Sequence, residues 1–229
     1  MGGQACVFYG AAQVSKDVDF LIFADEGNFE SLHTALRKLD ACRIAVPRFD
    51  PALLAKGHAV HFRCQAPGVE RLRINIMTKL RHLPPFDTLW ERRTVIADEH
   101  GNTFDLLSIP DLVQAKKTQR AKDWPVIELL VAIHHRENHR EDRAEGIDFW
   151  LTEARSAELL TELTRIYPDE TAGLLARRPL LALARANDLP ALRSALDAEV
   201  RAEQEKDRQY WEPLKREMAV FRRQERGEA

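Results

Sequence analysis

The chain changes character near Trp124, and no other feature of the sequence limits its fold as strongly. Before this point, short runs rich in β-branched and aromatic residues lie between segments containing proline or glycine, which is typical of strands separated by turns. After Trp124, strand signals are missing and apolar residues recur at the three- and four-residue steps of amphipathic helices. The sequence therefore predicts an α/β (α+β) domain over residues 1–123, followed by an all-helical domain over residues 124–229.

The expected elements follow from these local patterns. In the first domain, apolar residues at helical spacing predict a helix over residues 29–39. A second helix is predicted from about Ile109 to Gln119, with Ser108 as its cap. Strands are predicted over residues 18–23, 43–46, 59–64, 72–77, 94–97 and 103–107. In the second domain, helices are predicted over residues 126–133, 154–166, 171–176, 180–186, 192–200 and 203–223.

Composition and charge exclude several classes of function. The chain has 34 Lys and Arg against 36 Asp and Glu, a net charge of −2, which argues against a polybasic nucleic-acid coat. Its three cysteines are widely spaced and form no CxxC pair, so neither a disulfide framework nor a cysteine zinc site is expected. No apolar run approaches the roughly 18 residues that span a bilayer, and the first residues lack the pattern of a signal peptide. We therefore expect a cytoplasmic protein with no membrane partner.

Two aspartates open the first predicted strand. Side chains alternate between the faces of a strand, so Asp17 and Asp19 should share one face, while the apolar residues between and after them face the core. Neighbouring carboxylates repel each other, and a divalent cation that neutralises both explains why they occur together. Two such cations can hold the attacking and leaving oxygens of a nucleotidyl transfer. The Asp pair is therefore a candidate magnesium (or manganese) site, although such pairs also occur by chance on surface strands.

Two further segments are candidates for phosphate binding. Gly2 and Gly3 lie upstream of the Asp pair, and small residues let backbone N–H groups approach a phosphate closely. Downstream, Lys116 and Arg120 are four residues apart, so on a continuous helix they would share a face and grip a triphosphate. The alternative for this basic run is an ordinary solvated helix end.

In their order and spacing, these pieces resemble the nucleotidyltransferase superfamily related to DNA polymerase beta, and especially its small bacterial branch that includes the AbiEii-type abortive-infection toxins. That branch reads Gly-Gly-x-Ala, a short helix ending in Tyr/His-Gly, and Ser/Thr-Lys-Asp-x-Asp. The matching segments here are Gly2-Gly3-Gln4-Ala5, Tyr9-Gly10 and Ser15-Lys16-Asp17-Val18-Asp19. The branch ends with Leu-x-x-x-Lys and Arg-x-Lys-Asp, matched by Leu112 to Lys116 and by Arg120 to Asp123. The resemblance covers about residues 2–130.

The resemblance implies a nucleotidyltransferase-like mixed sheet with flanking helices and a helical appendage. It also implies that Asp17 and Asp19 bind magnesium. The residues it assigns to the nucleotide are Gly2, Gly3, Ser15, Lys16, Lys116, Arg120, Lys122 and Asp123. The implied reaction moves a nucleoside monophosphate from an NTP, such as ATP, to RNA, a protein or a small molecule. A role as a toxin with a partner antitoxin protein, or in phage defence, is implied by the same resemblance.

One position departs from the pattern of that branch. The branch carries a third carboxylate in Arg-x-Asp-x-Met, whereas this chain reads Arg73-Ile74-Asn75-Ile76-Met77. Alternation places Asn75 on the face of the site, but an amide is a poor magnesium ligand and cannot accept a proton as a base. Three alternatives stay open: a weak enzyme, an enzyme that uses another base, or a nucleotide- or protein-binding module that has lost catalysis. The sequence leans towards a nucleotidyltransferase with Asn75 in the third catalytic position.

Other candidates have ordinary explanations. His61 shares a strand face with Arg63, so it is either a nucleotide contact or a surface imidazole. His135 and His139 are spaced for a shared metal, yet no third ligand follows at fixed spacing, which favours a solvated helix end. The four tryptophans are interpreted as core residues rather than base-stacking platforms. In the resembled branch a strand precedes the Gly-Gly turn, which leaves two alternatives here, a start upstream of Met1 or a looser turn.

Overall fold

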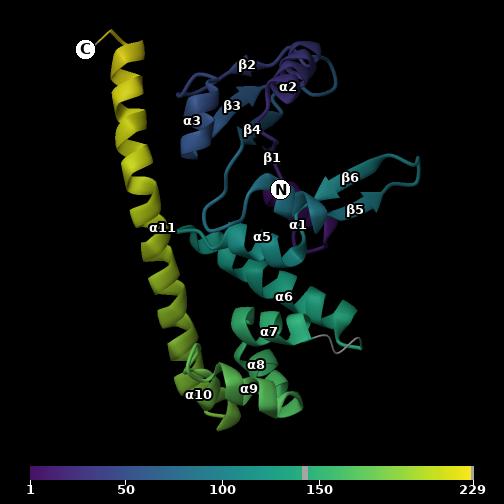
Figure 1. Cartoon of the computed structure of the whole chain (residues 1–229), viewed down its shortest axis with the longest axis vertical. Coiled ribbons are helices and arrows are strands. Elements are labelled where there is room, and N and C mark those ends of the chain that lie inside the picture. The colour runs from purple at the N-terminus through teal and green to yellow at the C-terminus, as the bar shows by residue number, and fades with distance from the viewer. Residues whose placement is uncertain (141–143, 228–229) are drawn as a thin grey trace. The chain divides into compact units, whose positions relative to one another are not determined.

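The computed structural model describes residues 1–140 and 144–227 (Figure 1). It divides into two compact units, an α/β unit formed by Met1–Ala115 with Gln209–Ala229, and a helical unit formed by Lys116–Arg208. The sequence predicted a border after residue 123 and assigned the whole C-terminus to the helical domain. In the structure the division falls earlier, and the end of the last helix belongs to the α/β unit because its glutamates bind basic side chains there.

A four-stranded mixed sheet forms the centre of the α/β unit. Its strands lie in the order β1 (Asp17–Leu21), β4 (Arg73–Met77), β3 (Val60–Arg63) and β2 (Cys42–Arg43). β1 pairs with β4 in parallel, whereas β3 pairs antiparallel with both β4 and β2. The strands confirm the sequence prediction, except that β2 is shorter than predicted. Its ladder stops before Pro47, which has no N–H to donate.

Helices α2 (Glu26–Lys38) and α3 (Pro51–Lys56) cover one face of this sheet (Figure 1). Each helix begins after an aspartate, Asp25 or Asp50, whose carboxylate accepts a backbone N–H of the first turn. The core that the helices and strands share contains Leu36, Leu54, Val60, Phe62, Cys64, Ile74 and Ile76. Because side chains alternate along a strand, the polar residues of β1, β4 and β3 lie on the opposite face.

The remaining elements of the α/β unit are short. Helix α1 (Gly2–Phe8) precedes β1, and helix α4 (Phe86–Glu91) precedes the two-stranded hairpin of β5 (Thr94–Ala97) and β6 (Thr103–Leu106). The hairpin confirms the last two predicted strands and forms a sheet of its own. α3 and α4 were not predicted, because helices of this length are too short for apolar periodicity to reveal them.

Two aromatic residues are more exposed than the sequence predicted. Phe20 lies on the edge strand β1, lines an apolar cavity of about 430 Å³ against α2, and is 45% exposed. Trp90, at the end of α4, is 43% exposed, with Phe86 stacked on it and the Arg93 guanidinium 3.9 Å from its ring centre. The interpretation of all four tryptophans as core residues is therefore wrong for Trp90, whereas Trp124 and Trp150 are buried.

Helix α5 (Ile109–Lys116) begins as predicted but ends earlier than Gln119. The Ser108 hydroxyl accepts the Asp111 N–H at 3.3 Å, which is the expected cap. After Lys116 the chain leaves the helix, and Arg120 is extended (φ −82°, ψ 121°). The prediction that Lys116 and Arg120 share one helix face is therefore wrong. The chain turns here instead, because the buried carboxylate of Asp123 draws both cations to itself.

The described residues of the helical unit contain no strand, as predicted. Its elements are the short helix η1 (Ala121–Asp123) and the α-helices α6 (Trp124–Asn138), α7 (Ala144–Glu153), α8 (Ala157–Ile166), α9 (Pro168–Leu174), α10 (Leu181–Arg185) and the start of α11 (Leu189–Glu225). The two helices predicted over 192–200 and 203–223 are one helix, because Arg201 and Ala202 both favour helix and Pro213 is accommodated within it. Over residues 1–140 and 144–227, no helix has both the length and the apolar composition needed to cross a membrane.

The end of α11 is attached to α3 within the α/β unit. The Lys56 ammonium donates to Glu217 Oε1 at 2.6 Å, and His58 Nε2 lies 2.8 Å from Glu217 Oε2. These hydrogen bonds, first from Lys56 and then from His58, lower the pKa of Glu217. Near the end of the same helix, Glu225 accepts from Arg43 of β2 at 2.6 Å.

Candidate functional site

The polar face of the sheet aligns the residues that the sequence singled out. Because β1 pairs with β4 and β4 with β3, Asp19, Asn75 and His61 form one row across three strands. The neighbouring row, two residues earlier on β1, consists of Asp17, Arg73 and Arg63. The structure therefore brings Asp17, Asp19 and Asn75 together on one face, in a setting that also contains an imidazole and two guanidinium groups.

Asn75 lies between Asp19 and His61 and bonds to both. Its Nδ2 donates to Asp19 Oδ1 at 2.8 Å, and its Oδ1 lies 2.7 Å from His61 Nδ1. Asn75 is buried, whereas Asp19 and His61 are partly exposed. The amide thus uses its nitrogen and its oxygen in fixed contacts, and it is not placed to serve as a metal ligand.

Asp17 faces Arg73 across the parallel pair of strands. Arg73 Nη1 lies 3.7 Å from Asp17 Oδ2, and the two side chains are 43% and 35% exposed. A contact this long and this exposed contributes little free energy. The carboxylate of Asp17 therefore remains able to bind a stronger cation.

Gly2 and Gly3 approach the site too closely for any side chain. A Cβ atom at Gly2 would lie 1.8 Å from Asp19 Oδ2, and one at Gly3 would lie 2.5 Å from Ser15 Oγ. Gly2 also has φ +72°, in the left-handed region that favours glycine. The Ser15 hydroxyl in turn donates to the Asp17 carbonyl oxygen at 2.8 Å. The backbone of Gly2 thus packs against the Asp19 carboxylate and that of Gly3 against Ser15, while phosphate binding by these glycines stays a prediction.

Lys16 brings a positive charge to the start of β1. It is exposed and lines an open hollow of about 390 Å³ together with residues 68–72. Since it immediately precedes Asp17, its ammonium is a candidate for a phosphate that binds near the carboxylates.

Four predicted phosphate-binding residues lie in the helical unit, around the buried carboxylate of Asp123. Lys116 Nζ is 3.4 Å from Asp123 Oδ1, and Arg120 Nε donates to Asp123 Oδ2 at 2.7 Å. Lys116 is buried with Asp123, whereas Arg120 and Lys122 are exposed. Of the three cations, Arg120 and Lys122 present their charge to solvent. A role of Lys116, Arg120, Lys122 and Asp123 in phosphate binding stays a prediction.

The Asp pair fits a cation that arrives with a nucleotide. Within the described part of the chain, no group of three or more His, Cys, Asp or Glu side chains could hold a metal ion. Asp17 and Asp19 supply two carboxylates on one face. Magnesium is usually bound by one or two carboxylates, with water and substrate phosphates completing its octahedral shell. Magnesium at Asp17 and Asp19 would therefore need water or substrate phosphates as further ligands, and its binding there stays a prediction.

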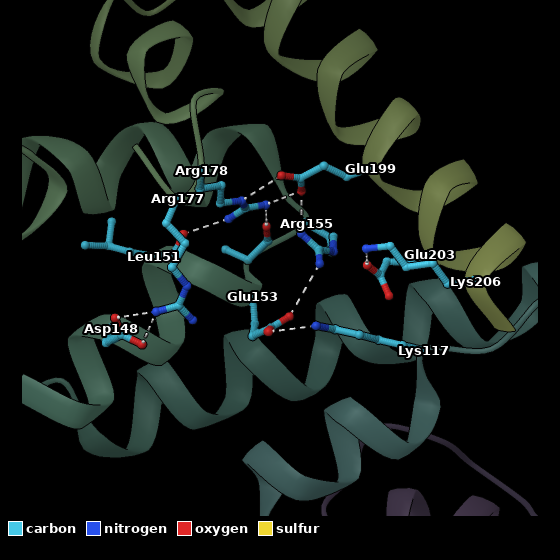
Figure 2. Close-up of polar contacts among 11 residues, drawn as sticks. Lys117, Asp148, Leu151, Glu153, Arg155, Arg177, Arg178, Glu199, Glu203 and Lys206 are labelled. Atoms are coloured by element: carbon cyan, nitrogen blue, oxygen red, sulfur yellow. Dashed lines mark hydrogen bonds and ion pairs between the residues drawn. The ribbon is translucent and has the colours of Figure 1, made fainter. Parts of the chain in front are cut away.

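A second polar cluster lies inside the helical unit and differs in kind (Figure 2). Glu153 binds Lys117 at 2.7 Å and Arg155 at 3.4 Å. Glu199 binds Arg155 and Arg178 at 2.8 Å each. Figure 2 shows these side chains pointing toward one another from α7, α11 and the connecting segments. Arg178 also donates to the carbonyl oxygens of Leu151 in α7 and of Ala154 directly after it.

Burial perturbs the cations of this cluster. Desolvation lowers the pKa of Lys117, and the nearby Glu153 only partly offsets it. Desolvation, followed by repulsion from Arg178, likewise lowers the pKa of Arg155. Glu153 is itself buried, and each carboxylate binds two cations, so we assign this cluster to the stability of the helical unit.

Sequence reasoning located the carboxylates but missed what surrounds them. His61 was left between two interpretations, and its bond to Asn75 follows only from the antiparallel register of β3 with β4. Arg73 was seen as part of a motif, and its position opposite Asp17 depends on the parallel register of β1 with β4. Alternation in each strand gave the faces, but nothing local in the sequence gave the registers.

Comparison with known proteins identifies no relative. No family model, no curated protein and no solved structure matches the chain.

Proposed function

We propose that this protein is a magnesium-dependent nucleotidyltransferase that moves a nucleoside monophosphate from an NTP to a hydroxyl or phosphate of RNA, a protein or a small molecule. The observation that supports this best is the contact of the Gly2 backbone with Asp19 on a strand that also presents Asp17. In this proposal the Asp pair takes the cation and the adjacent Gly2 backbone takes a phosphate of the same nucleotide.

Each residue of the site has a role in this proposal. Asp17 and Asp19 hold magnesium, which would neutralise charge on the phosphates as it develops. The backbone of Gly2 and Gly3 and the side chain of Lys16 hold the phosphates themselves. The resemblance also assigns Arg120 and Lys122, which are exposed on the helical unit, to the nucleotide phosphates.

Asn75 favours a second candidate, a nucleotide- or protein-binding module that has lost catalysis. It replaces the expected third carboxylate, and its amide already donates to Asp19. A protein that binds NTP and magnesium at the Asp pair without transferring nucleotide would satisfy the same geometry. The toxin role with an antitoxin partner belongs to the proposal through the resemblance alone, and a cytoplasmic location through the composition and cysteine usage of the chain.

Thermal unfolding with and without NTP and magnesium tests nucleotide binding at this site. Ligand that binds only the folded state raises the melting temperature by mass action, so NTP with magnesium should raise it. Asp17→Asn combined with Asp19→Asn should abolish the rise. Glu26→Gln combined with Glu30→Gln is the matched control, since it removes two exposed carboxylates from α2. A shift that survives the aspartate changes would place the ligand elsewhere.

Incubation with α-labelled NTPs separates the two candidates. Each labelled NTP is mixed with the protein, magnesium or manganese, and total cell RNA and protein. Transfer of label that depends on Asp17 and Asp19 supports the enzyme. Binding of NTP without transfer to any acceptor supports the binding module.

A further inference from the structure

His61 is held in one orientation on the polar face of the sheet. It lies in register with Asn75 on the neighbouring strand, and its Nδ1 is 2.7 Å from Asn75 Oδ1. The residue as a whole is partly exposed. The imidazole therefore stands beside the row that contains Asp19, with one nitrogen already committed.

The direction of each hydrogen bond in this row follows from chemistry. An ionised carboxylate only accepts, so Asp19 requires the Nδ2 amino group of Asn75 to face it. The Asn75 oxygen must then face His61, where it can only accept, so His61 Nδ1 must carry a proton. In a neutral imidazole with a proton on Nδ1, Nε2 has a free lone pair and is the basic atom.

We propose that His61 is the general base of the proposed nucleotidyl transfer, with Asn75 as the residue that fixes its tautomer. This inference rests on the proposed function and specifies how the reaction proceeds without a third carboxylate. Asn75 then acts as a positioning residue for His61, which is a reason for an amide at this place. An ionised aspartate at position 75 would repel Asp19 and could not donate a hydrogen bond to it.

The step balances with groups that the proposal names. His61 Nε2 takes the proton of an acceptor hydroxyl while that oxygen forms a bond to the α-phosphorus of the NTP. The bond from the α-phosphorus to the bridging oxygen breaks, and its electron pair leaves with pyrophosphate. The imidazolium that forms keeps its Nδ1 proton, which it donates to Asn75 Oδ1, and returns the Nε2 proton to solvent.

The other side chains of this face are poorer bases. Arg63 and Arg73 carry guanidinium groups, which donate hydrogen bonds but offer no lone pair to a proton. Asp17 and Asp19 are assigned to the cation, which makes them weak proton acceptors. Asn75 has no basic atom. Among the described residues of these two rows, His61 therefore combines a basic atom with a fixed orientation.

Two substitutions at His61 separate a base from a structural residue. His61→Asn keeps an N–H near the position of Nδ1 and can still donate to Asn75, but it has no counterpart of Nε2. His61→Ala removes the whole ring and leaves space for free imidazole. His100→Ala, on the exposed turn between β5 and β6, is the control. Label transfer from α-labelled NTP to total cell RNA and protein is measured at saturating NTP, and NTP binding is measured by the magnesium-dependent thermal shift.

Both His61 variants should transfer label about 10²-fold more slowly than the wild type, which is the low end of general-base effects. The NTP-induced thermal shift of both should be unchanged, and His100→Ala should behave like the wild type. Added imidazole should restore transfer to His61→Ala but not to His61→Asn. Full transfer by His61→Asn would overturn the role of His61 while leaving the proposed function intact. Transfer of no label by the wild type, with binding retained, would overturn both.

The tautomer of His61 gives a readout that does not depend on activity. In ¹⁵N-histidine-labelled protein, long-range proton–nitrogen correlations should show His61 protonated at Nδ1 and unprotonated at Nε2. Asn75→Leu should release this preference, because the acceptor that fixes it is gone. A proton on Nε2 in the wild type, with Nδ1 unprotonated, would overturn the proposal even if the protein transfers nucleotide.

Discussion

The two polar clusters of this protein use charge in opposite ways. In the helical unit, the buried Glu153 and the partly exposed Glu199 each bind two cations (Figure 2). On the sheet, Asp19 accepts from a neutral amide, and Asp17 faces one partly exposed guanidinium at 3.7 Å. Removing one partner from closely paired buried charges destabilises a fold, whereas weakly compensated carboxylates attract a cation from solution. This difference is our reason for assigning binding to the sheet and stability to the helical cluster.

The largest expected effect is on the stability of the helical cluster. Glu153→Ala leaves Lys117 and Arg155 buried beside each other without a carboxylate between them. Removing one partner of a buried ion pair costs about 3–5 kcal/mol, so the urea midpoint should fall clearly. Glu158→Gln, which breaks an exposed pair with Arg193, should leave the midpoint nearly unchanged. Equal midpoints for all three proteins would mean that the cluster does not stabilise the unit.

The Asp pair should show the opposite behaviour without ligand. Asp17→Asn with Asp19→Asn removes mutual repulsion, and the amide of residue 19 can still accept from Asn75. We expect the free energy of unfolding to stay the same or to rise by up to about 1 kcal/mol, although binding is lost. Urea unfolding of the nucleotide-free protein measures this. A loss of unfolding free energy as large as that of Glu153→Ala would show that the aspartates stabilise the fold. The contrast between the sheet and the helical cluster would then be wrong.

The contacts of Glu217 with Lys56 and His58 should make the stability of the folded protein depend on pH. The pKa of Glu217 is lowered by its hydrogen bonds from Lys56 and His58, so the folded state holds this carboxylate charged. Its stabilising effect is complete above the ordinary glutamate pKa of about 4.5 and is lost as pH falls through the lowered folded-state pKa. Melting temperatures between neutral pH and pH 3 should fall less steeply for Glu217→Gln than for the wild type. Parallel curves would contradict this role for Glu217.

The smallest stability change is expected at Arg120. It is about half exposed, and Asp123 keeps Lys116 and Thr118 as partners, so Arg120→Gln should cost under about 1 kcal/mol. If Arg120 contacts the distal phosphates, the same change weakens binding of a triphosphate more than that of a monophosphate. Titration of both nucleotides by calorimetry distinguishes these effects. Equal losses for the two nucleotides would remove Arg120 from the site.

Local patterns predicted much of the fold because its elements are long enough to carry them. Strand alternation gave the faces of Asp17, Asp19 and Asn75. Apolar spacing gave α2, and the Ser108 cap gave the start of α5. The end of α5 was missed because Asp123, a buried residue farther along the chain, competes with the helix for Lys116 and Arg120. Helix α7 was missed, and with it Glu153, whose partners come from distant segments. Contacts of this kind depend on packing, which local spacing does not encode.

The close contact between Gly2 and Asp19 has a practical consequence. A single methyl group at residue 2 would occupy the space of a carboxylate oxygen, so Gly2→Ala must push Asp19 aside or open the turn. Such a variant keeps every ionisable group of the native protein, and its net charge is unchanged. This variant therefore changes the geometry of the site without changing its charge. Any nucleotide binding that it retains comes from long-range electrostatic attraction, and any binding that it loses depends on the geometry at Gly2.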